Sequence, residues 1–280
     1  MSRLTIRYGG GSPGARFVDG GRPFLRREAI SGGGAADPAA ARLANDLLGQ
    51  SATHPTVELP LSGGVWHLSG PGQLALTGAD MNWRLDGIPV PLARVVSLRD
   101  THELRGSFAR NGCRAYLAIR GTWCLPEIRG SVETGLPGTL DPPALRQWVV
   151  QPGSHLSEVG KQAIRYSDEA LLNCVPGPEF DLLDRERRLA LLNVVYSLDP
   201  ASDRQGLRLQ HESWRSWEPP TQLSSAVLPG TVQLTPSGPI VLGPDAQTVG
   251  GYPRVLQVVD GLAAAYQLRP GGSVRFTVNP

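Results

Sequence analysis

Arginine and aspartate lie close together at two places in the chain, and such pairs could bind or activate an anionic group. The first place is Asp19-Gly-Gly-Arg22, and the second is Asp203-Arg204, followed by Arg208. A guanidinium presents parallel N–H donors that match the oxygens of a carboxylate or phosphate. A neighbouring carboxylate can orient that guanidinium or transfer a proton. Asp19, Arg22, Asp203 and Arg204 are therefore candidate catalytic residues, although structural ion pairs that fix turns would give the same pattern.

The segment Asp245–Tyr252 is the strongest candidate for substrate contact, because polar residues and glycines crowd into one short stretch. Gly250-Gly251 permits backbone conformations and a close ligand approach that a Cβ would obstruct. Gln233 could equally satisfy a strand edge, and Tyr252 could form a packing corner with Pro253. The candidate substrate-binding residues are Arg208, Asn45, Gln233, Asp245, Gln247, Thr248, Gly250, Gly251 and Tyr252.

Residue types and spacings exclude several common kinds of site. The chain has 26 arginines but a single lysine, Lys161, whose surroundings lack the Ser or Thr and the upstream glycine of a Walker-type nucleotide site. The three cysteines form no CxxC pair, and the five histidines form neither HxH nor HExxH. No G-x-S-x-G nucleophile elbow is present. We therefore expect no metal site, and the usual hydrolase signatures are missing.

Composition indicates a globular protein. Of 280 residues, 40% are hydrophobic and 19% are charged, and the 34 glycines and 25 prolines predict many turns. The net charge of +2 gives no field that would attract nucleic acid or an anionic membrane. No stretch approaches the ~18 apolar residues that cross a bilayer, and Met1–Gly11 lacks the apolar core of a secretory signal. We expect a cytoplasmic protein.

Short strands separated by Gly or Pro dominate the pattern, as at 114–119, 239–242 and 273–278. Val274, Phe276 and Val278 share one face of the last of these, which suits a half-buried strand. Regularly spaced short strands are typical of barrels and sandwiches. The sequence therefore predicts a mainly β protein.

Helices are few. The clearest is expected over 37–48, where Asp37 suits the N-cap better than it suits proton transfer, Pro38 takes the first helical position and Gly49 ends the helix. A second helix is expected over 180–192, and a short one begins at Asp260.

Two segments resemble each other and predict two related β units. In both 61–80 and 228–245, a glycine turn precedes a strand, and a second apolar strand ends at Gly-x-Asp. Patterning is poorest between Gly135 and Pro178. We therefore predict an N-terminal β subdomain over 1–140, a connecting region over 141–178 and a C-terminal β-barrel subdomain over 179–280.

Several motifs in a fixed order resemble the allophanate hydrolase subunit 2 family, which includes the C subunit of 5-oxoprolinase, the Kip antagonist protein and the carboxyltransferase part of urea carboxylase. The resemblance covers nearly the whole chain. The motifs are Gly32-Gly-Gly-Ala-Ala-Asp-Pro38, Ala44-Asn45, Leu76-Thr-Gly-Ala79, Arg114-Ala-Tyr-Leu117, Gly130-Ser131, Ser202-Asp-Arg-Gln-Gly-Leu-Arg-Leu209, Gly230-Thr-Val-Gln233, Gly238-Pro-Ile-Val-Leu242, Asp245-Ala-Gln-Thr-Val-Gly-Gly-Tyr-Pro253 and Gln267-Leu-Arg-Pro-Gly271.

This resemblance implies two cyclophilin-like β-barrel subdomains related by an internal duplication. It also implies a partner of the allophanate hydrolase subunit 1 type, such as the B subunit of 5-oxoprolinase, and a third chain, the A subunit. Together these three chains would convert 5-oxoproline, a lactam, to glutamate with ATP, and the resemblance leaves open which of them binds ATP. A lactam carbonyl is a poor electrophile until its oxygen is phosphorylated, so positioned cations would do much of the work.

The chain departs from the family pattern at polar positions. Val18 stands where the family has glutamine in T-x-Q-D-x-G-R, and Val132 and Ala246 stand where it has arginine in G-S-R-S-T and D-R-Q-T. A bidentate contact cannot survive such changes. Two alternatives therefore stay open: a non-catalytic Kip-antagonist-like protein that sequesters a homologue of the B subunit, and a carboxyltransferase component acting on urea or another amide. In the latter case biotin would arrive on another chain, because Lys161 has no A-M-K-M context.

Overall fold

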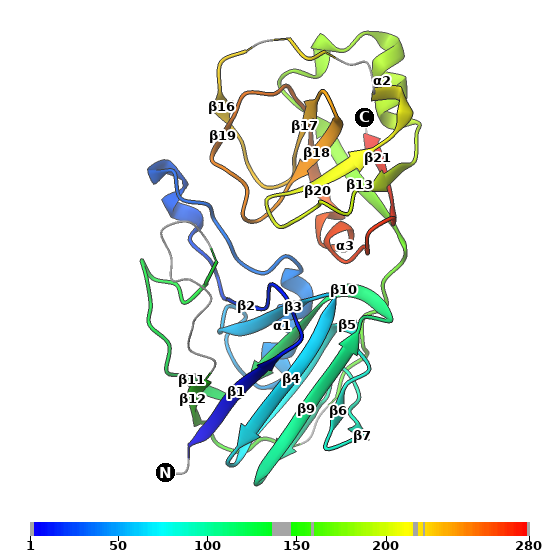
Figure 1. The fold of residues 1–280 in the computed structure, drawn as a ribbon. Helices are drawn as coiled ribbons and strands as arrows, with labels where there is room; N and C mark the ends of the chain where they lie inside the picture. The colour runs from blue at the N-terminus through cyan, green and yellow to red at the C-terminus, as the bar shows by residue number, and fades with distance from the viewer. Residues whose placement is uncertain (1–2, 136–146, 158–159, 215–217, 221, 279–280) are drawn as a thin grey trace. The chain divides into compact units, whose positions relative to one another are not determined.

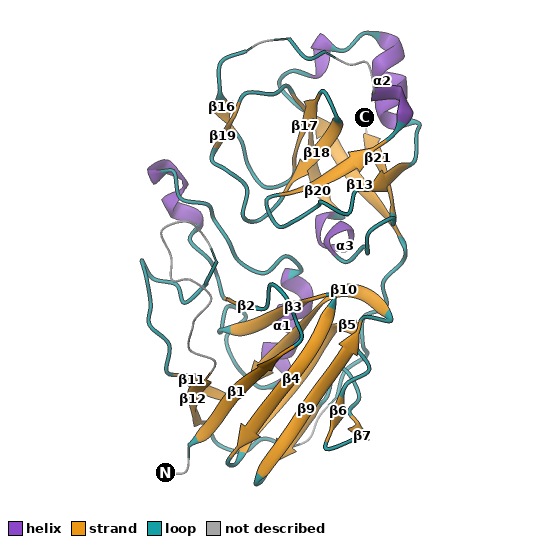
Figure 2. Ribbon diagram, viewed as in Figure 1, coloured by secondary structure: helices purple, strands orange, loops and turns teal. Residues whose placement is uncertain are grey.

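The computed structural model describes residues 3–135, 147–157, 160–214, 218–220 and 222–278, and strands dominate it (Figure 2), which confirms the predicted mainly β class. The chain divides into two compact units (Figure 1). Unit 1 comprises Met1–Arg22 and Gly33–Tyr166, and unit 2 comprises Pro23–Gly32 and Ser167–Pro280. A short early segment therefore belongs to the unit built mainly from the second half of the sequence.

Unit 1 consists of two antiparallel sheets around one apolar core. The seven-stranded sheet has the order β11 (Gly121–Trp123), β12 (Gln147–Pro152), β1 (Leu4–Gly10), β4 (Ser62–Ser69), β9 (Thr101–Phe108), β6 (Arg84–Leu85) and β7 (Ile88–Pro89). The five-stranded sheet has the order β2 (Arg16–Val18), β3 (Thr56–Pro60), β10 (Asn111–Ile119), β5 (Gly72–Asp80) and β8 (Val95–Leu98). Both sheets contribute to the core, for example through Trp66 of β4 and Leu117 of β10.

Unit 2 is built on a closed seven-stranded barrel. Its strands run in the order β13 (Glu169–Pro176), β20 (Arg254–Asp260), β17 (Thr231–Thr235), β18 (Gly238–Leu242), β15 (Gly206–Gln210), β14 (Tyr196–Leu198) and β21 (Ser273–Val278). Parallel pairing of β13 with β21 closes the barrel. Tyr196, Trp214 and Phe276 are fully buried, and the Trp214 indole donates to the Tyr196 hydroxyl. A two-stranded ribbon, β16 (Ser225–Ala226) with β19 (Val249–Gly250), is attached.

The expected helix at 37–48 is α1 (Pro38–Leu47), and the Asp37 carboxylate caps it by accepting from the Ala40 amide. The expected helix over 180–192 is divided into a 3-10 turn, η2 (Phe180–Leu182), and α2 (Arg185–Leu192), because Asp184 begins a new helix by capping Arg187 N–H. The third is α3 (Leu262–Tyr266), and two further 3-10 turns are η1 (Pro23–Glu28) and η3 (Glu212–Trp214). No helix among the described residues is long and apolar enough to cross a membrane.

The structure adds detail to the expected organisation. The expected connecting region, 141–178, contains β12, which pairs with β1 in unit 1, and β13, a barrel strand of unit 2; residues 141–146 lie outside the described residues. The two similar segments are paired differently. β17 and β18 form an antiparallel hairpin, whereas β4 pairs with β1 and β9, and β5 pairs with β10 and β8.

Candidate functional site

Arg22 is a buried cation without a counter-charge. Its side chain is among the buried charged residues, at 3% exposure, and its guanidinium donates to the carbonyl oxygens of Ile128 (2.9 Å), Ser131 (2.8 Å) and Glu133 (3.4 Å). Among the described residues no carboxylate pairs with it, and its Nη1 has no hydrogen-bond partner. A buried charge is costly unless it is paired. The geometry therefore suits an anion that is bound in the working protein.

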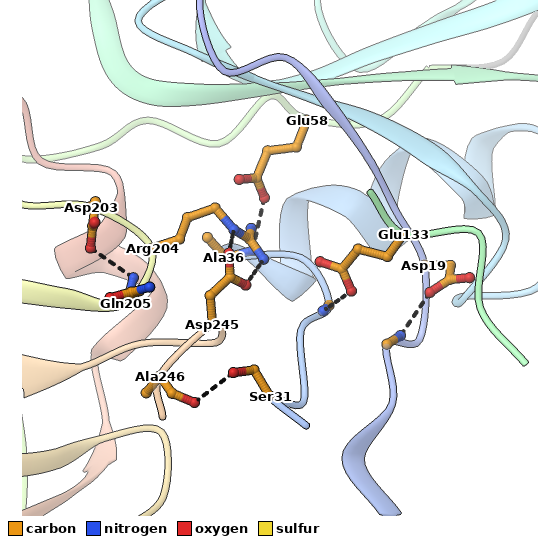
Figure 3. Close-up of polar contacts among 12 residues, drawn as sticks. Asp19, Ser31, Ala36, Glu58, Glu133, Asp203, Arg204, Gln205, Asp245 and Ala246 are labelled. Carbon is orange, nitrogen blue, oxygen red and sulfur yellow. Dashed lines mark hydrogen bonds and ion pairs between the residues drawn. The ribbon is translucent and has the colours of Figure 1, made fainter. Parts of the chain in front are cut away.

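Asp19 does not pair with Arg22, although the sequence placed the two close together. One carboxylate oxygen accepts from Gly21 N–H (2.8 Å) and from the Ser131 hydroxyl (2.6 Å), and the other accepts from Val132 N–H (2.9 Å) (Figure 3). Asp19 and Arg22 thus bind the same 128–133 segment from two sides. In this structure Asp19 organises the loop around Arg22.

Glu58 of β3 lies buried opposite Tyr116 of β10, its direct cross-strand neighbour. One Glu58 oxygen accepts from the Tyr116 hydroxyl (2.9 Å) and from Ala36 N–H (2.9 Å). The other lies 3.7 Å from Arg114 Nε. Two strands and the segment before α1 therefore converge on a single carboxylate that is 1% exposed.

Asp37 extends this network. Its N–H donates to the Tyr116 hydroxyl (2.7 Å), and one of its carboxylate oxygens accepts from the Tyr166 hydroxyl (2.8 Å). Burial, and then the negative charges of Glu58 and Asp37, raise the pKa of Tyr116 well above 10. Tyr116 therefore stays protonated and keeps donating to Glu58.

A third buried carboxylate, Glu133, accepts from Gly34 N–H (2.8 Å). A Cβ added at Gly33 would lie 2.0 Å from a Glu133 oxygen, and the Gly33 φ of +69° also favours glycine. The glycine-rich run before α1 thus lets the backbone approach this acid. We call Asp19, Asp37, Glu58 and Glu133 the carboxylate cluster of unit 1.

In unit 2, Arg204 pairs with Asp245 rather than with its neighbour in sequence. Two parallel hydrogen bonds, 2.9 and 2.6 Å long, join the guanidinium to the carboxylate, and both residues are 7% exposed (Figure 3). The Asp203 carboxylate accepts from the N–H groups of Gln205 (2.8 Å) and Gly206 (3.2 Å). Asp203 therefore fixes the turn before β15.

The Asp245–Tyr252 segment is held in place by side chains of unit 2. Arg26 of η1 donates to the carbonyls of Val227 (2.7 Å), Gln247 (2.9 Å) and Ala246 (3.4 Å), and burial lowers its pKa. The Ser31 hydroxyl also donates to the Ala246 carbonyl (3.0 Å). The 23–32 segment thus positions the residues that the sequence singled out for substrate contact.

Gln233 links the same segment to β17. Its amide nitrogen donates to the Tyr252 carbonyl (3.1 Å), and its oxygen accepts from the Gln247 side chain (3.4 Å). A Cβ at Gly250 would lie 2.5 Å from the Gln233 amide nitrogen, which is the physical reason for glycine there. Tyr252 is 44% exposed beside these groups.

The other candidates lie elsewhere. Asn45 of α1 is fully buried and donates to the His54 carbonyl and the Thr56 hydroxyl, so its role is structural. Arg208 is exposed on β15. The Thr248 carbonyl accepts from Val227 N–H, and a Cβ at Gly251 would meet no atom closer than 3.5 Å.

Sequence reasoning missed Glu58, Arg114, Tyr116, Glu133 and Arg26 as parts of these sites. One signal was available: Glu58 is the only charged residue in the otherwise apolar stretch Thr56-Val-Glu-Leu-Pro60. A charge that is folded into a strand of this kind must be paired. The partners could not be found in this way, because they come from distant parts of the chain.

The three positions that depart from the family pattern are all buried. Val18 packs with Ala40, Ala41 and Tyr116, Val132 joins the main core of unit 1, and Ala246 packs with Val227 and Leu242. Apolar packing has replaced polar function at these positions. Among the described residues, no three His, Cys, Asp or Glu side chains are grouped so that they could hold a metal ion.

Comparison with known proteins gives a consistent result. The family model for the carboxyltransferase domain, subdomain A and B, matches residues 29–278. The chain is 33% identical to the C subunit of 5-oxoprolinase from Haemophilus influenzae, over 94% of this chain and 87% of that protein. It is 34% identical to the C subunit of 5-oxoprolinase from Escherichia coli, over 86% of this chain and 80% of that protein.

Solved structures share the fold. The crystal structure of TTHA0988 is 26% identical with a TM-score of 0.89, and the match covers 98% of this chain and 56% of that one. The Kluyveromyces lactis urea carboxylase is 21% identical with a TM-score of 0.86, covering 99% of this chain and 27% of that one, which shows the fold alone. The chain thus corresponds to about half of the first structure and a quarter of the second.

Proposed function

Because the chain belongs to the carboxyltransferase domain family, subdomains A and B, we propose that it is the C-type subunit of an ATP-dependent 5-oxoprolinase. In this role it acts with a B-type partner to activate the lactam, and an A-type protein completes the hydrolysis. One observation carries the proposal: 33–34% identity to two proteins named as the C subunit of 5-oxoprolinase, over most of both chains.

The site geometry is compatible with this chemistry. 5-Oxoproline carries a carboxylate and a ring amide, and phosphorylation of its carbonyl oxygen makes the ring open to water. Arg22 is a buried guanidinium with an unused nitrogen, which suits a substrate carboxylate or a phosphoryl group. Glu58 and Asp37, held by tyrosine hydroxyls, are fixed carboxylates that could accept hydrogen bonds from the ring N–H.

The first experiment tests Arg22 in a complex with the B-type and A-type partners. Loss of a charge-assisted hydrogen bond costs about 1.5–3 kcal/mol, so Arg22→Gln should raise the KM for 5-oxoproline about 10- to 100-fold. Arg27→Gln is the matched control, because the Arg27 side chain is 83% exposed in the adjacent turn. An unchanged KM in a folded Arg22→Gln protein would remove Arg22 from the site.

A non-catalytic role is the second candidate, supported by the buried apolar side chains of Val18, Val132 and Ala246. Such a chain would bind and sequester a homologue of the B subunit without turnover. It predicts a stable complex in gel filtration and no glutamate release in the complete mixture. Val132→Arg and Ala246→Arg would each place a guanidinium in an apolar cluster, so restoring the family residues should destabilise the protein rather than restore activity.

A carboxyltransferase role is the third candidate, supported by the family description and by the fold shared with the K. lactis urea carboxylase. It predicts transfer of a carboxyl group from carboxybiotin, delivered on another chain, to urea or another amide. Biotin-dependent carboxylation of urea, with no turnover of 5-oxoproline, would favour it over the first proposal.

A further inference from the structure

A second cavity lies in unit 1, and its lining shares no residue with the carboxylate cluster. It measures about 340 Å³, at the small end of the range of ligand pockets. It lies where strands of both sheets end: β5 begins at Gly72, paired with Leu98 at the end of β8, and β12 ends at Pro152, paired with Gly121. Arg120 joins the two sheets there, because its N–H donates to the Gln73 carbonyl (2.8 Å).

The rim of the cavity is fixed by side chains. Gln73 is 2% exposed, and its amide accepts from Leu156 N–H (2.8 Å) and donates to the Leu156 carbonyl (2.8 Å). Arg120 donates to the carbonyl (2.5 Å) and hydroxyl (3.2 Å) of Ser154, and to the Leu48 carbonyl. The chain after β12 is therefore tied across the end of the unit by two side chains.

The lining is cationic and partly apolar. Among the described residues, Arg120 has only neutral oxygen partners, and no acidic side chain lines the cavity. Pro71, Leu98 and Pro152 supply apolar surface. A pocket that combines an uncompensated guanidinium with apolar walls favours a ligand that has both a negative charge and an apolar part.

His155 adds a hydrogen-bonding group to this lining. The orientation of the Gln73 amide is fixed by Leu156, so the nitrogen that faces His155 Nε2 at 3.4 Å is a donor. The Ser97 hydroxyl also lies 3.2 Å from His155 Nε2. Nε2 therefore accepts, and the proton of the neutral ring is on Nδ1.

We propose that this cavity is a binding site for a small carboxylate with an apolar body, separate from the site of the proposed function. Arg120 supplies the charge, His155 lines the entrance, and the two prolines with Leu98 contact the apolar part. The inference does not depend on lactam chemistry, because it uses no residue of the carboxylate cluster.

The test compares benzoate with benzamide, which has nearly the same shape without the charge. Amide signals of the ¹⁵N-labelled full chain are recorded during titration with each compound. Benzoate should shift the signals of Gly72, Gln73 and Gly153, and benzamide should shift them much less. Equal binding of the two compounds, no shift at these residues, or binding of inorganic phosphate in preference to benzoate would overturn the proposal.

Variants locate the binding. Arg120→Gln should weaken benzoate binding at least about tenfold, because a charged contact is lost. His155→Ala is the second variant, since its side chain is exposed and its loss leaves the fold unchanged; a severalfold loss of affinity is expected. Arg99→Gln is the matched control, because Arg99 is exposed next to Leu98 but does not line the cavity. Unchanged benzoate binding in Arg120→Gln and His155→Ala would place the site elsewhere.

Discussion

Replacing Tyr116 by phenylalanine removes one oxygen from the interior of unit 1 and leaves the fully buried ring in place. Glu58 then loses a hydrogen bond to its charged carboxylate, worth about 1.5–3 kcal/mol, and the buried Asp37 N–H loses its acceptor, at a cost of about 1–3 kcal/mol. The variant no longer buries a hydroxyl, which returns about 1–3 kcal/mol. The net loss in free energy of unfolding should be about 2–3 kcal/mol.

Urea titration of both proteins measures this difference, and the midpoint should fall while the slope with denaturant stays constant. Tyr252→Phe is the matched control, because Tyr252 is 44% exposed, and it should change stability by less than about 0.5 kcal/mol. A double-mutant cycle of Tyr116→Phe with Glu58→Gln should show a coupling of about 1 kcal/mol or more. A loss below about 0.5 kcal/mol for Tyr116→Phe, or purely additive effects, would refute the network described for this site.

Three further predictions concern charge and reactivity. Asp245→Asn should lower the free energy of unfolding by about 3–5 kcal/mol, because it leaves the buried Arg204 guanidinium without its partner; a circular-dichroism melt that matches the native protein would contradict this. Arg254 hydrogen bonds lower the pKa of Glu179 below its ordinary 4.5, so their stabilisation is complete above that pH and is lost as pH falls through the lowered pKa; urea titrations between pH 3 and 6 should show this loss in the native protein and not in Glu179→Gln. Cys124 is exposed and the other two cysteines are buried, so a thiol reagent at pH 8 should modify one thiol in the folded protein and three after unfolding; fast reaction of more than one would show that the cores open readily.

Local patterns in the sequence predicted the regular elements well. β21 was expected at 273–278 and lies at Ser273–Val278, since its alternating apolar residues face the barrel core. The helix at 37–48 could be predicted because Asp37, Pro38 and Gly49 are local signals for its two ends. The division at Asp184 was missed because a second cap inside an expected helix resembles any other acidic residue.

The pairing of distant residues could not be predicted. Arg204 is followed along the chain by many polar groups, and only the closure of the barrel brings Asp245 to it, 41 positions later. The pairing of β12 with β1 joins residues that are far apart in the sequence, so β12 looked like part of a connection. Hydrophobic periodicity reports which face of a strand is buried, but not which strand lies beside it.

The most direct test of the proposed function is an omission experiment with purified proteins. The A and B subunits of 5-oxoprolinase are mixed with 5-oxoproline and ATP, with and without this chain, and glutamate and ADP are measured in the same samples. We predict that both products appear together only when this chain is present. Equal turnover in its absence, or a stable complex that contains the chain but forms no glutamate, would contradict a catalytic role as the C subunit.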